Sequence, residues 1–362
     1  MVVLGSTGSI GVNTLILAER HFLPVEVLVA GQNADLLQSQ IDTFAPKTVV
    51  VADEATARKL NHPDVRFGEA AILQAIEESR SDLVVNALVG FLGLRPTLSA
   101  LACGKRVALA NKESLVVAGQ FIDTSRIIPI DSEHFGLWYL LSERRIRKMS
   151  ITASGGAFRD WDLEKIAGAG LEDVLKHPNW SMGQKITIDS ATMVNKLFEL
   201  IEAHWLFRGR FDGEPRFDAL IETRSIIHAL IDFADGSTTA HMAYTDMKLP
   251  IAFALGLDPQ EAVLEPVDLV EVGRLEFRKI TPDRYGIWEI KDDCLRRPQK
   301  GAIINAANEA AIELFLEGRC GFLDIARLIK SAYETYSHAS PKNLDDVFAI
   351  DKEVRAYVRT SC

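Results

Sequence analysis

The sequence contains few cysteines, and their positions argue against structures that depend on cysteine. The four form no C-x-x-C pair, and none has a metal-ligand spacing to a histidine; they are Cys103, Cys294, Cys320 and Cys362. A disulfide framework and a zinc-finger site are therefore not expected. Four free thiols indicate a reducing compartment, so the expected location is the cytoplasm.

Long apolar runs and an excess of basic residues are also missing. No run approaches the roughly 18 apolar residues of a membrane-spanning helix, and MVVLG at the start has neither the charged nor the apolar region of a signal peptide. The 50 acidic and 40 basic residues give a formal net charge of −10. Because such a surface repels nucleic acid and anionic membranes, we expect neither as a partner, although a few local cations can still bind a small phosphorylated ligand.

Short apolar runs alternate with amphipathic stretches through residues 1–131. Strands that alternate with helices predict an α/β fold with a Rossmann-like, doubly wound parallel sheet covered on both faces. Ligands of such sheets gather at the carboxyl ends of the strands. The predicted strands lie at 2–5, 25–31, 48–52, 82–90, 105–111 and 127–131, and the predicted helices near 11–21, 33–44, 69–79 and 93–103.

This alternation ends after residue 131. Strand patterns at 149–155 and 216–245, with a long helix near 190–207, predict a central α+β domain. A stretch rich in proline, glycine and charge then predicts a linker, and helical patterns at 302–332 and 343–358 predict a C-terminal helical domain. The predicted division is therefore 1–131, 132–255, 256–285 for the linker and 286–362.

The stretch GSTGSIG, Gly5 to Gly11, follows the first predicted strand and opens a helix. Glycines allow the backbone to approach a pyrophosphate, and the helix N-terminus supplies N–H donors and a partial positive charge. The spacing G-x-x-G-x-x-G is less common than G-x-G-x-x-G, and a tight turn without a ligand is the alternative. The preceding strand favours a dinucleotide site.

The end of the second strand, VAGQN at 29–33, bears on which dinucleotide is bound. NAD-binding folds usually place an acidic residue there to bind the ribose hydroxyls, and this chain has none. The missing acid favours NADP, because a carboxylate would repel the 2′-phosphate. No arginine or lysine is present to bind that phosphate, so the indication for NADP is weak.

Acidic and polar residues follow the strand IIPID without an intervening turn. Asp131 and Glu133 are two apart, and on an extended chain both carboxylates would point to one side. Oxygen ligands on one side suit a hard divalent cation such as Mg²⁺ or Mn²⁺, which needs a third protein ligand or waters. The alternative is a solvated strand end.

A third ligand is expected from the helix within HPNWSMGQKITIDSATMVNKLFELIEAHW, residues 177–205. Asn195, Lys196 and Glu199 share one face of that helix, because they are three or four residues apart. Glu199 would bind the metal, and Lys196 with Ser190 would bind a phosphate. The alternative is the solvent side of an amphipathic helix, but the neighbouring residues are apolar.

Two further loops carry polar residues just past predicted strands. ALANKES, at 108–114, contains Asn111, Lys112 and Glu113, and TASGGAFR offers Ser154 as an anion or hydroxyl ligand. A solvated loop accounts for one charge in ALANKES, but it does not account for the position on the ligand-binding edge.

Together these motifs resemble one family over nearly the whole chain, the 1-deoxy-D-xylulose 5-phosphate reductoisomerases. The resemblance rests on six segments in the same order, of which HPNWSMG is the most specific. They are GSTGSIG, ALANKES, DSEH, ASGGAFR, HPNWSMGQKITIDSATMVNK and, at 305–318, NAANEAAIELFLEG.

The resemblance implies an NADPH- and divalent-metal-dependent enzyme. It would rearrange and reduce 1-deoxy-D-xylulose 5-phosphate, a small phosphorylated ketose, to 2-C-methyl-D-erythritol 4-phosphate in non-mevalonate isoprenoid biosynthesis. The cation would be Mg²⁺ or Mn²⁺. The three-domain subunit would form a homodimer, with residues 132–255 holding the metal and the dimer contacts.

The resemblance also implies roles for individual residues. The metal ligands would be Asp131, Glu133 and Glu199. Substrate would be bound by Lys112, Ser132, Ser154, His177, Trp180, Ser190, Asn195 and Lys196, with Trp180 on a closing loop. Cofactor would be bound by Thr7, Gly8, Ser9, Ile10, Gly31, Gln32, Asn33, Asn111, Glu113 and Gly183. The catalytic groups would be Lys112, Glu133 and His177, and the proton carrier stays open among His177, Glu133 and a water on the metal.

Two of the departures from the family pattern bear on function. Gln32 stands where a lysine is common, and Glu222, Thr223 and Arg224 precede Ser225 where the family usually has His-Pro-Gln. One alternative is another NADP-dependent dehydrogenase of a small aldehyde or semialdehyde, which would not need a carboxylate triad together with a phosphate cluster. The other is a nucleotide-sensing protein without turnover, against which the intact acids argue.

Overall fold

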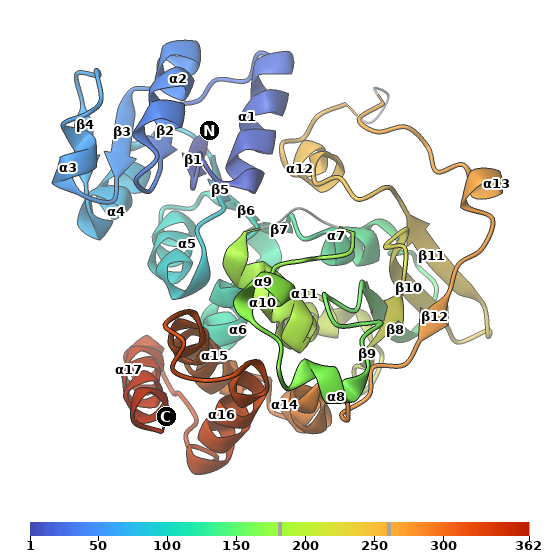
Figure 1. Cartoon of the computed structure of the whole chain (residues 1–362). Coiled ribbons are helices and arrows are strands. Elements are labelled where there is room, and N and C mark those ends of the chain that lie inside the picture. The colour runs from blue at the N-terminus through green and yellow to red at the C-terminus, as the bar shows by residue number, and fades with distance from the viewer. Residues whose placement is uncertain (180–182, 259–261, 362) are drawn as a thin grey trace. The chain divides into compact units, whose positions relative to one another are not determined.

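The computed structural model describes residues 1–179, 183–258 and 262–361 (Figure 1). The chain divides into two compact units, each assembled from three stretches. Unit 1 comprises Met1–Ser114, Asp123–Asp131 and Asp246–Leu264, and unit 2 comprises Leu115–Ile122, Ser132–Thr245 and Glu265–Cys362. Trp180, predicted to contact substrate, lies outside the described residues.

Unit 1 contains a seven-stranded sheet in which every strand pair is parallel. The strand order is β4-β3-β2-β1-β5-β6-β7, so the chain winds outward from β1 first in one direction and then in the other. This order confirms the predicted doubly wound sheet, and it makes the end of β1 the switch point at which such sheets bind ligands. The strands are β1 (Val2–Leu4), β2 (Val27–Val29), β3 (Thr48–Val51), β4 (Val65–Phe67), β5 (Leu83–Asn86), β6 (Arg106–Leu109) and β7 (Ile127–Pro129).

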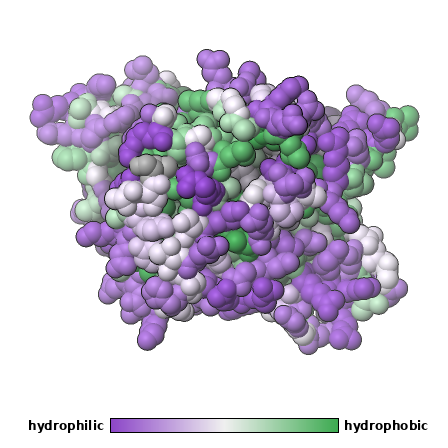
Figure 2. Space-filling model, turned by 60° about the horizontal axis from the view of Figure 1, so that its bottom comes forward, coloured by the Kyte–Doolittle hydropathy of each residue, from purple (hydrophilic) through white to green (hydrophobic). Residues whose placement is uncertain are grey.

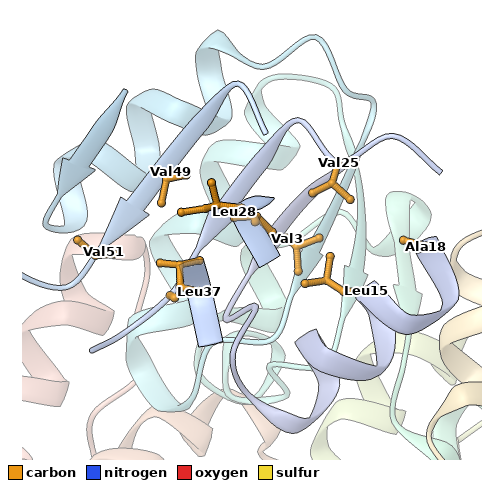
Figure 3. Close-up of a cluster of buried hydrophobic side chains, with 10 residues drawn as sticks. Val3, Leu15, Ala18, Val25, Leu28, Leu37, Val49 and Val51 are labelled. Atoms are coloured by element: carbon orange, nitrogen blue, oxygen red, sulfur yellow. The ribbon is translucent and has the colours of Figure 1, made fainter. Parts of the chain in front are cut away.

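Helices cover this sheet because its central strands are buried along their whole length. Figure 3 shows one of the resulting clusters, in which Leu15 of the first helix and Leu37 of the second pack on Val3, Leu28 and Val49. Full burial of a Val or Leu side chain contributes roughly 1.5–3 kcal/mol. The helices are α1 (Ser9–Arg20), α2 (Ala34–Phe44), α3 (Glu54–Ala57), α4 (Glu69–Glu78) and α5 (Leu94–Ala102), with short 3₁₀ segments η1 (Gly90–Gly93) and η3 (Thr124–Arg126).

A late segment of the chain completes unit 1. Helix α12 (Lys248–Ala254) follows the strands of unit 2 in sequence, yet it packs beside α1. Ile251 of α12 joins Leu17 of α1 and Leu83 and Ile130 in one buried apolar cluster. Contacts far apart in sequence therefore fix this side of the parallel sheet.

Unit 2 is built on a five-stranded mixed sheet with the order β11-β10-β8-β9-β12. Only β8 and β9 are parallel, and the other pairs are antiparallel. The sheet confirms the predicted α+β architecture. Its strands are β8 (Ile146–Ala153), β9 (Phe217–Glu222), β10 (Ile227–Phe233), β11 (Thr238–Met242) and β12 (Phe277–Arg278).

Helices make up the rest of unit 2, and the last three pack together as the predicted C-terminal helical region (Figure 1). These three are α15 (Gly301–Leu316), α16 (Phe322–Thr335) and α17 (Leu344–Thr360). The others are α7 (Ser132–Tyr139), α8 (Leu163–Ile166), α9 (Leu171–Val174), α10 (Gln184–Thr192), α11 (Val194–Phe207), α13 (Leu269–Val272) and α14 (Lys291–Arg296), with the 3₁₀ segments η2 (Gly119–Phe121), η4 (Arg208–Arg210), η5 (Gly286–Ile290) and η6 (Pro298–Lys300). Helix α6 (Glu113–Ala118) begins in the sequence of unit 1 and ends in that of unit 2.

Two local predictions were wrong. The segment from Asp131 to Glu133 is not extended, because β7 ends at Pro129 and Glu133 lies in the first turn of α7. A polar stretch before an apolar run is a helix-start signal, and it outweighed the strand pattern. The long helix expected near 190–207 is also interrupted, since Met193 has a left-handed backbone (φ +69°) between α10 and α11.

Hydrophilic residues cover most of the face in Figure 2, and the hydrophobic residues form smaller areas among them. Among the described residues, no helix combines the length and the apolar character needed to cross a membrane.

Candidate functional site

The glycine-rich turn after β1 has the geometry of a phosphate-binding turn. Gly5 has φ +82°, and a Cβ there would lie 2.6 Å from the carbonyl oxygen of Ala87. A Cβ on Gly11 would lie 2.2 Å from the carbonyl oxygen of Gly5, so both positions require glycine. Gly8, the N-cap of α1, has no side chain to cap the first N–H groups. These donors suit a pyrophosphate at Thr7, Gly8, Ser9 and Ile10.

At the ends of β2 and β3, Gln32 is hydrogen-bonded to an acidic residue. Its Nε2 donates to Asp53 Oδ2 at 2.8 Å, and Asp53 also caps α3 by accepting the N–H of Thr56 at 2.8 Å. The bond from Gln32, followed by those from Thr56, lowers the pKa of the Asp53 carboxyl, which keeps it ionised. The sequence pattern at the end of β2 does not reveal this acid, because Asp53 lies past the end of β3.

The other residues predicted there differ in their local roles. Asn33 caps α2 by accepting the N–H of Leu36 at 3.2 Å. Gly31 has open space where a side chain would stand. Both lie beside Gln32 in the chain, so the three predicted residues form one short segment at the end of β2.

Asn111 connects the loop after β5 to the start of α6 through hydrogen bonds. It is 1% exposed, and its Nδ2 donates to the carbonyl oxygens of Leu88 at 2.9 Å and Gly90 at 2.8 Å. It also donates to Glu113 Oε2 at 3.1 Å. The amide of Asn111 thus orients Glu113 and the backbone beside Lys112.

Lys112 and Asp131 meet at the ends of the neighbouring strands β6 and β7. The ammonium donates to Asp131 Oδ2 at 2.7 Å, and the two side chains are 8% and 11% exposed. Removing one partner of such a pair leaves an uncompensated charge, which is strongly destabilising. The parallel order of the sheet brings these residues together from 19 positions apart.

Glu133, Lys196 and Glu199 form an ion cluster in unit 2. The Lys196 ammonium lies 2.6 Å from Glu133 Oε1 and 2.5 Å from Glu199 Oε2. Asn195 donates to Glu199 Oε1 at 2.5 Å, which confirms that the predicted polar residues share one face of α11. Asp131, one residue before α7, completes a group of three carboxylates, each with an oxygen within 4.8 Å of the others.

This group fits a hard divalent cation. It offers only oxygen ligands, and three carboxylates are a ligand set that Mg²⁺ or Mn²⁺ accepts. Ser132 Oγ donates to Glu133 Oε2 at 2.5 Å, so the second acid has a neighbour that orients it. Orientation of a ligand by a hydrogen bond raises metal affinity.

Ser154 and His177 are brought together from two separate loops. The distance between Ser154 Oγ and His177 Nε2 is 2.9 Å. Burial, together with the positive charges of Arg159 and Lys196, lowers the pKa of His177 to about 4. His177 is therefore neutral near pH 7, and a neutral imidazole can donate through one nitrogen and accept through the other.

The segment that departs from the family pattern supports the histidine loop. Glu222 is fully buried, and its Oε2 accepts the N–H of Ile226 at 2.7 Å, which shapes the turn around Ser225 (φ +56°). Asn179 Nδ2 donates to Ser225 Oγ at 2.7 Å, and Arg159 donates to the carbonyl oxygen of Thr223 at 2.7 Å. The bonds from Asn179 to Thr223 and Ser225 attach the end of the His177 loop to this segment.

Two of the remaining predicted residues lie on α10. Ser190 is half-buried and donates to the carbonyl oxygen of Ile186 at 2.8 Å. Gly183 is the N-cap of the same helix and has open space around it. Ser190 lies in the last turn of α10, three residues before the bend at Met193 that leads into α11.

Sequence reasoning missed a buried pair behind the carboxylates. His134 Nδ1 lies 3.2 Å from Glu202 Oε2, and His134 Nε2 lies 2.8 Å from the carbonyl oxygen of Glu199. Both side chains are at most 1% exposed. The spacing of Glu202 three residues after Glu199 was the available signal, because it places both acids toward α7.

Family models match most of the chain. The model described as 1-deoxy-D-xylulose 5-phosphate reductoisomerase matches residues 1–119, and its C-terminal domain matches residues 127–207. A further model, described as the DXP reductoisomerase C-terminal domain, matches residues 242–357.

Curated relatives match over the full length. The 1-deoxy-D-xylulose 5-phosphate reductoisomerase of Nautilia profundicola is 59% identical, with 100% of both chains covered. The protein of the same name from Wolinella succinogenes is 51% identical, with 99% of both chains covered.

Solved structures of reductoisomerases are also similar to this chain. A crystal structure of DOX-P reductoisomerase in complex with NADPH, fosmidomycin and magnesium is 32% identical, with a TM-score of 0.90, 99% of this chain and 97% of that chain covered. The Zymomonas mobilis reductoisomerase in complex with NADPH is 35% identical, with a TM-score of 0.87 and the same coverage.

Proposed function

The chain belongs to the 1-deoxy-D-xylulose 5-phosphate reductoisomerase family, and we propose that its residues carry out the reaction of that family. The enzyme converts 1-deoxy-D-xylulose 5-phosphate to 2-C-methyl-D-erythritol 4-phosphate with NADPH and a divalent cation, in non-mevalonate isoprenoid precursor biosynthesis. The observation that carries the assignment to this chain's own residues is the convergence of Asp131, Glu133 and Glu199.

When bound, the cation stabilises negative charge on neighbouring oxygens of the substrate, and NADPH supplies the hydride that reduces the rearranged aldehyde. Asp131, Glu133 and Glu199 hold the cation. Ser132 and Asn195 orient two of these acids through their bonds to Glu133 and Glu199. Lys112, next to Asp131, adds positive charge where the substrate oxygens become negative.

Ser190, Asn195 and Lys196 bind the phosphate, with Ser154 and His177 beside them. The phosphate group is remote from the reacting carbons of the substrate, so the free energy of binding it can be used to order the site. Nδ1 of the neutral His177 accepts the backbone N–H of Asn179, so Nε2 carries the proton and donates to Ser154 Oγ. His177 and Glu133 are the two protein groups proposed for proton transfer.

NADPH is bound at the glycine-rich turn after β1. The first turn of α1 has no side-chain cap at Gly8, which supports a pyrophosphate at Thr7 to Ile10, and Gly31, Gln32 and Asn33 follow β2, at whose end such sheets bind the adenine ribose. Asn111, Glu113 and Gly183 complete the cofactor residues, and Trp180 contributes to substrate binding.

We also propose the finer organisation of the protein. Residues 1–131 form the NADPH-binding domain, 132–255 the catalytic domain, 256–285 a linker and 286–362 a helical domain, and two subunits associate as a dimer through 132–255. A cytoplasmic location is supported by Cys103, Cys294 and Cys320, which are all free thiols.

The test is NADPH oxidation by the purified protein with 1-deoxy-D-xylulose 5-phosphate, with and without Mg²⁺ or Mn²⁺. Metal-dependent turnover to 2-C-methyl-D-erythritol 4-phosphate is the expected result. Reduction of simple aldehydes without a metal would instead indicate an ordinary dehydrogenase, and NADPH binding without turnover would indicate a sensor.

A further inference from the structure

The motif NAANEA, at 305–310, has no part in the proposed reaction, yet it carries two asparagines in the apolar interior of α15. Asn305 and Asn308 are both 0% exposed. A buried amide costs free energy unless it is hydrogen-bonded. Asn308 has such a bond, because its Nδ2 donates to Asp189 Oδ1 at 2.7 Å. The amide of Asn305 has no hydrogen-bond partner among the described residues.

Asp189 joins α10 to α15 through this hydrogen bond. It is 2% exposed, and its second oxygen, Oδ2, accepts from Lys185 at 2.8 Å. The carboxylate is therefore bonded on one side within α10 and on the other side to α15. Hydrogen bonds to a charged group are worth about twice those between neutral groups.

The orientation of α10 depends on such a bond because a residue with a left-handed backbone follows the helix. Met193 connects α10 to α11 with φ +69°, and a bulky non-glycine residue in this region costs of order 1–3 kcal/mol. Strain of this kind persists only where the surroundings fix the conformation. The glycine-rich turn provides one contact, since a Cβ on Gly156 would lie 2.6 Å from the carbonyl oxygen of Ser190. The bond from Asn308 to Asp189 provides another.

The angle at Met193 determines how two phosphate-binding elements meet. Ser190 follows Asp189 directly in α10, whereas Asn195 and Lys196 lie in the first turn of α11. A small rotation of α10 would move Ser190 away from Lys196 without altering either helix internally. Misplacement by about 1 Å of a binding group can cost on the order of a hundredfold in rate.

We propose that Asn308 is a positioning residue for substrate phosphate. It holds Asp189, and through it α10, at the angle that directs Ser190 toward the phosphate bound by Asn195 and Lys196. The proposal rests on the phosphate site of the proposed function. It gives the C-terminal helical region a part in substrate binding, although no residue of that region is proposed to touch the substrate.

The test compares Asn308→Leu with Asn305→Leu. Leucine is close to asparagine in size, and the two positions share a helix, a residue type and full burial, so only the bond to Asp189 distinguishes them. Asn308→Leu is expected to raise the KM for 1-deoxy-D-xylulose 5-phosphate and the inhibition constant of inorganic phosphate about tenfold. The KM for NADPH should change less than about twofold, and Asn305→Leu should leave all three constants within about twofold.

Exchange of the two partners gives a second, independent arm. Asp189→Asn alone should weaken phosphate binding, and Asp189→Asn combined with Asn308→Asp should restore part of it, because an amide–carboxylate bond is formed again. This double variant also serves if Asn308→Leu does not fold. Three results would overturn the proposal. The inhibition constant of phosphate could be unchanged in a folded Asn308→Leu protein, it could rise equally in Asn305→Leu, or phosphate binding could fail to recover in the double variant.

Failure of the proposed function has a different signature. If the wild type does not turn over 1-deoxy-D-xylulose 5-phosphate, calorimetric titration with inorganic phosphate still compares the wild type with the variants. Tight phosphate binding that Asn308→Leu weakens would then support positioning without the reaction. Absence of phosphate binding in the wild type would contradict both the proposed function and the positioning role of Asn308.

Discussion

Lys196 and Glu199 form an ion pair 2.5 Å long across one turn of α11, with side chains that are only 5% and 2% exposed. The same ammonium lies 2.6 Å from Glu133, so one lysine is paired with two carboxylates of the proposed cation site. A divalent cation held by these carboxylates would compete with the lysine for the same oxygens, and the displaced ammonium would then be available to the proposed substrate phosphate.

The first prediction concerns the carboxylates. Glu199→Gln keeps the shape of the side chain but removes its charge, so metal binding should weaken and kcat/KM should fall on the order of a thousandfold. The measurement is turnover across a Mg²⁺ titration, with Asp131→Asn and Glu133→Gln in parallel. A residue whose variant keeps near-normal turnover at low Mg²⁺ is not a ligand.

The second prediction concerns the lysine itself. Lys196→Met removes the competing ammonium and keeps an unbranched side chain, so Mg²⁺ should bind more tightly while the KM for substrate rises at least tenfold. Calorimetric titration measures the dissociation constant of Mg²⁺, and steady-state kinetics measure the KM for substrate. Lys291→Met is the control, because Lys291 pairs with Asp218 at 3.1 Å and not with the carboxylates of the cation site. Weaker Mg²⁺ binding in Lys196→Met would contradict the competition.

The third prediction concerns the choice between NADPH and NADH. Gln32 offers no positive charge to a 2′-phosphate, and its amide is bonded to the ionised Asp53. Gln32→Lys should raise the ratio of kcat/KM for NADPH to that for NADH by about ten- to a hundredfold, since a charge-assisted bond is worth roughly 1.5–3 kcal/mol. Asp53→Asn should change the ratio in the same direction by removing a negative charge.

The control for this pair is Glu54→Gln. Glu54 is the next residue after Asp53 and is paired with Arg58 at 2.8 Å, so it carries the same charge without contacting Gln32. The ratio should stay within about twofold of wild type. A wild type that uses NADH better than NADPH would show that this loop has been misinterpreted.

The fourth prediction concerns stability in acid. Burial, and then the nearby His228, lowers the pKa of His241 to about 4 from an ordinary 6.5. The unfolded chain therefore takes up a proton at His241 between pH 6.5 and 4, whereas the native protein does not. The free energy of unfolding should be unaffected by this group above pH 6.5 and should fall below it by up to about 1.4 kcal/mol per pH unit.

Urea unfolding at pH 7.5, 6.5, 5.5 and 5.0 measures this fall. The variant His241→Gln should show a shallower loss over the same range, because the titrating group is gone. Carboxyl groups with lowered pKa, such as Glu26 with a pKa of about 2, add a loss of the same sign only toward lower pH. An identical slope in wild type and His241→Gln would exclude His241 as the source.

The local pattern of the sequence determined the parallel sheet. The central strands β1, β2, β3 and β5 are buried, largely apolar runs, and the glycines of GSTGSIG are required by the positive φ of Gly5 and the close approach at Gly11. Spacing along a helix likewise predicted that Asn195, Lys196 and Glu199 share a face. The edge strand β4 was missed because it is short and only partly buried, which leaves little apolar signal.

Contacts between distant segments required the tertiary structure. The bond between Gln32 and Asp53, the bond between Asn308 and Asp189 and the packing of α12 beside α1 join residues that no sequence period relates. The bend at Met193 is also decided by packing, because a methionine in a left-handed conformation is locally unfavourable. The sequence alone therefore determined most of the elements and the chemical types at the site, through short-range patterns of burial and spacing. The tertiary structure decided which partner each buried polar group meets, because that partner must be supplied by another segment wherever water is excluded.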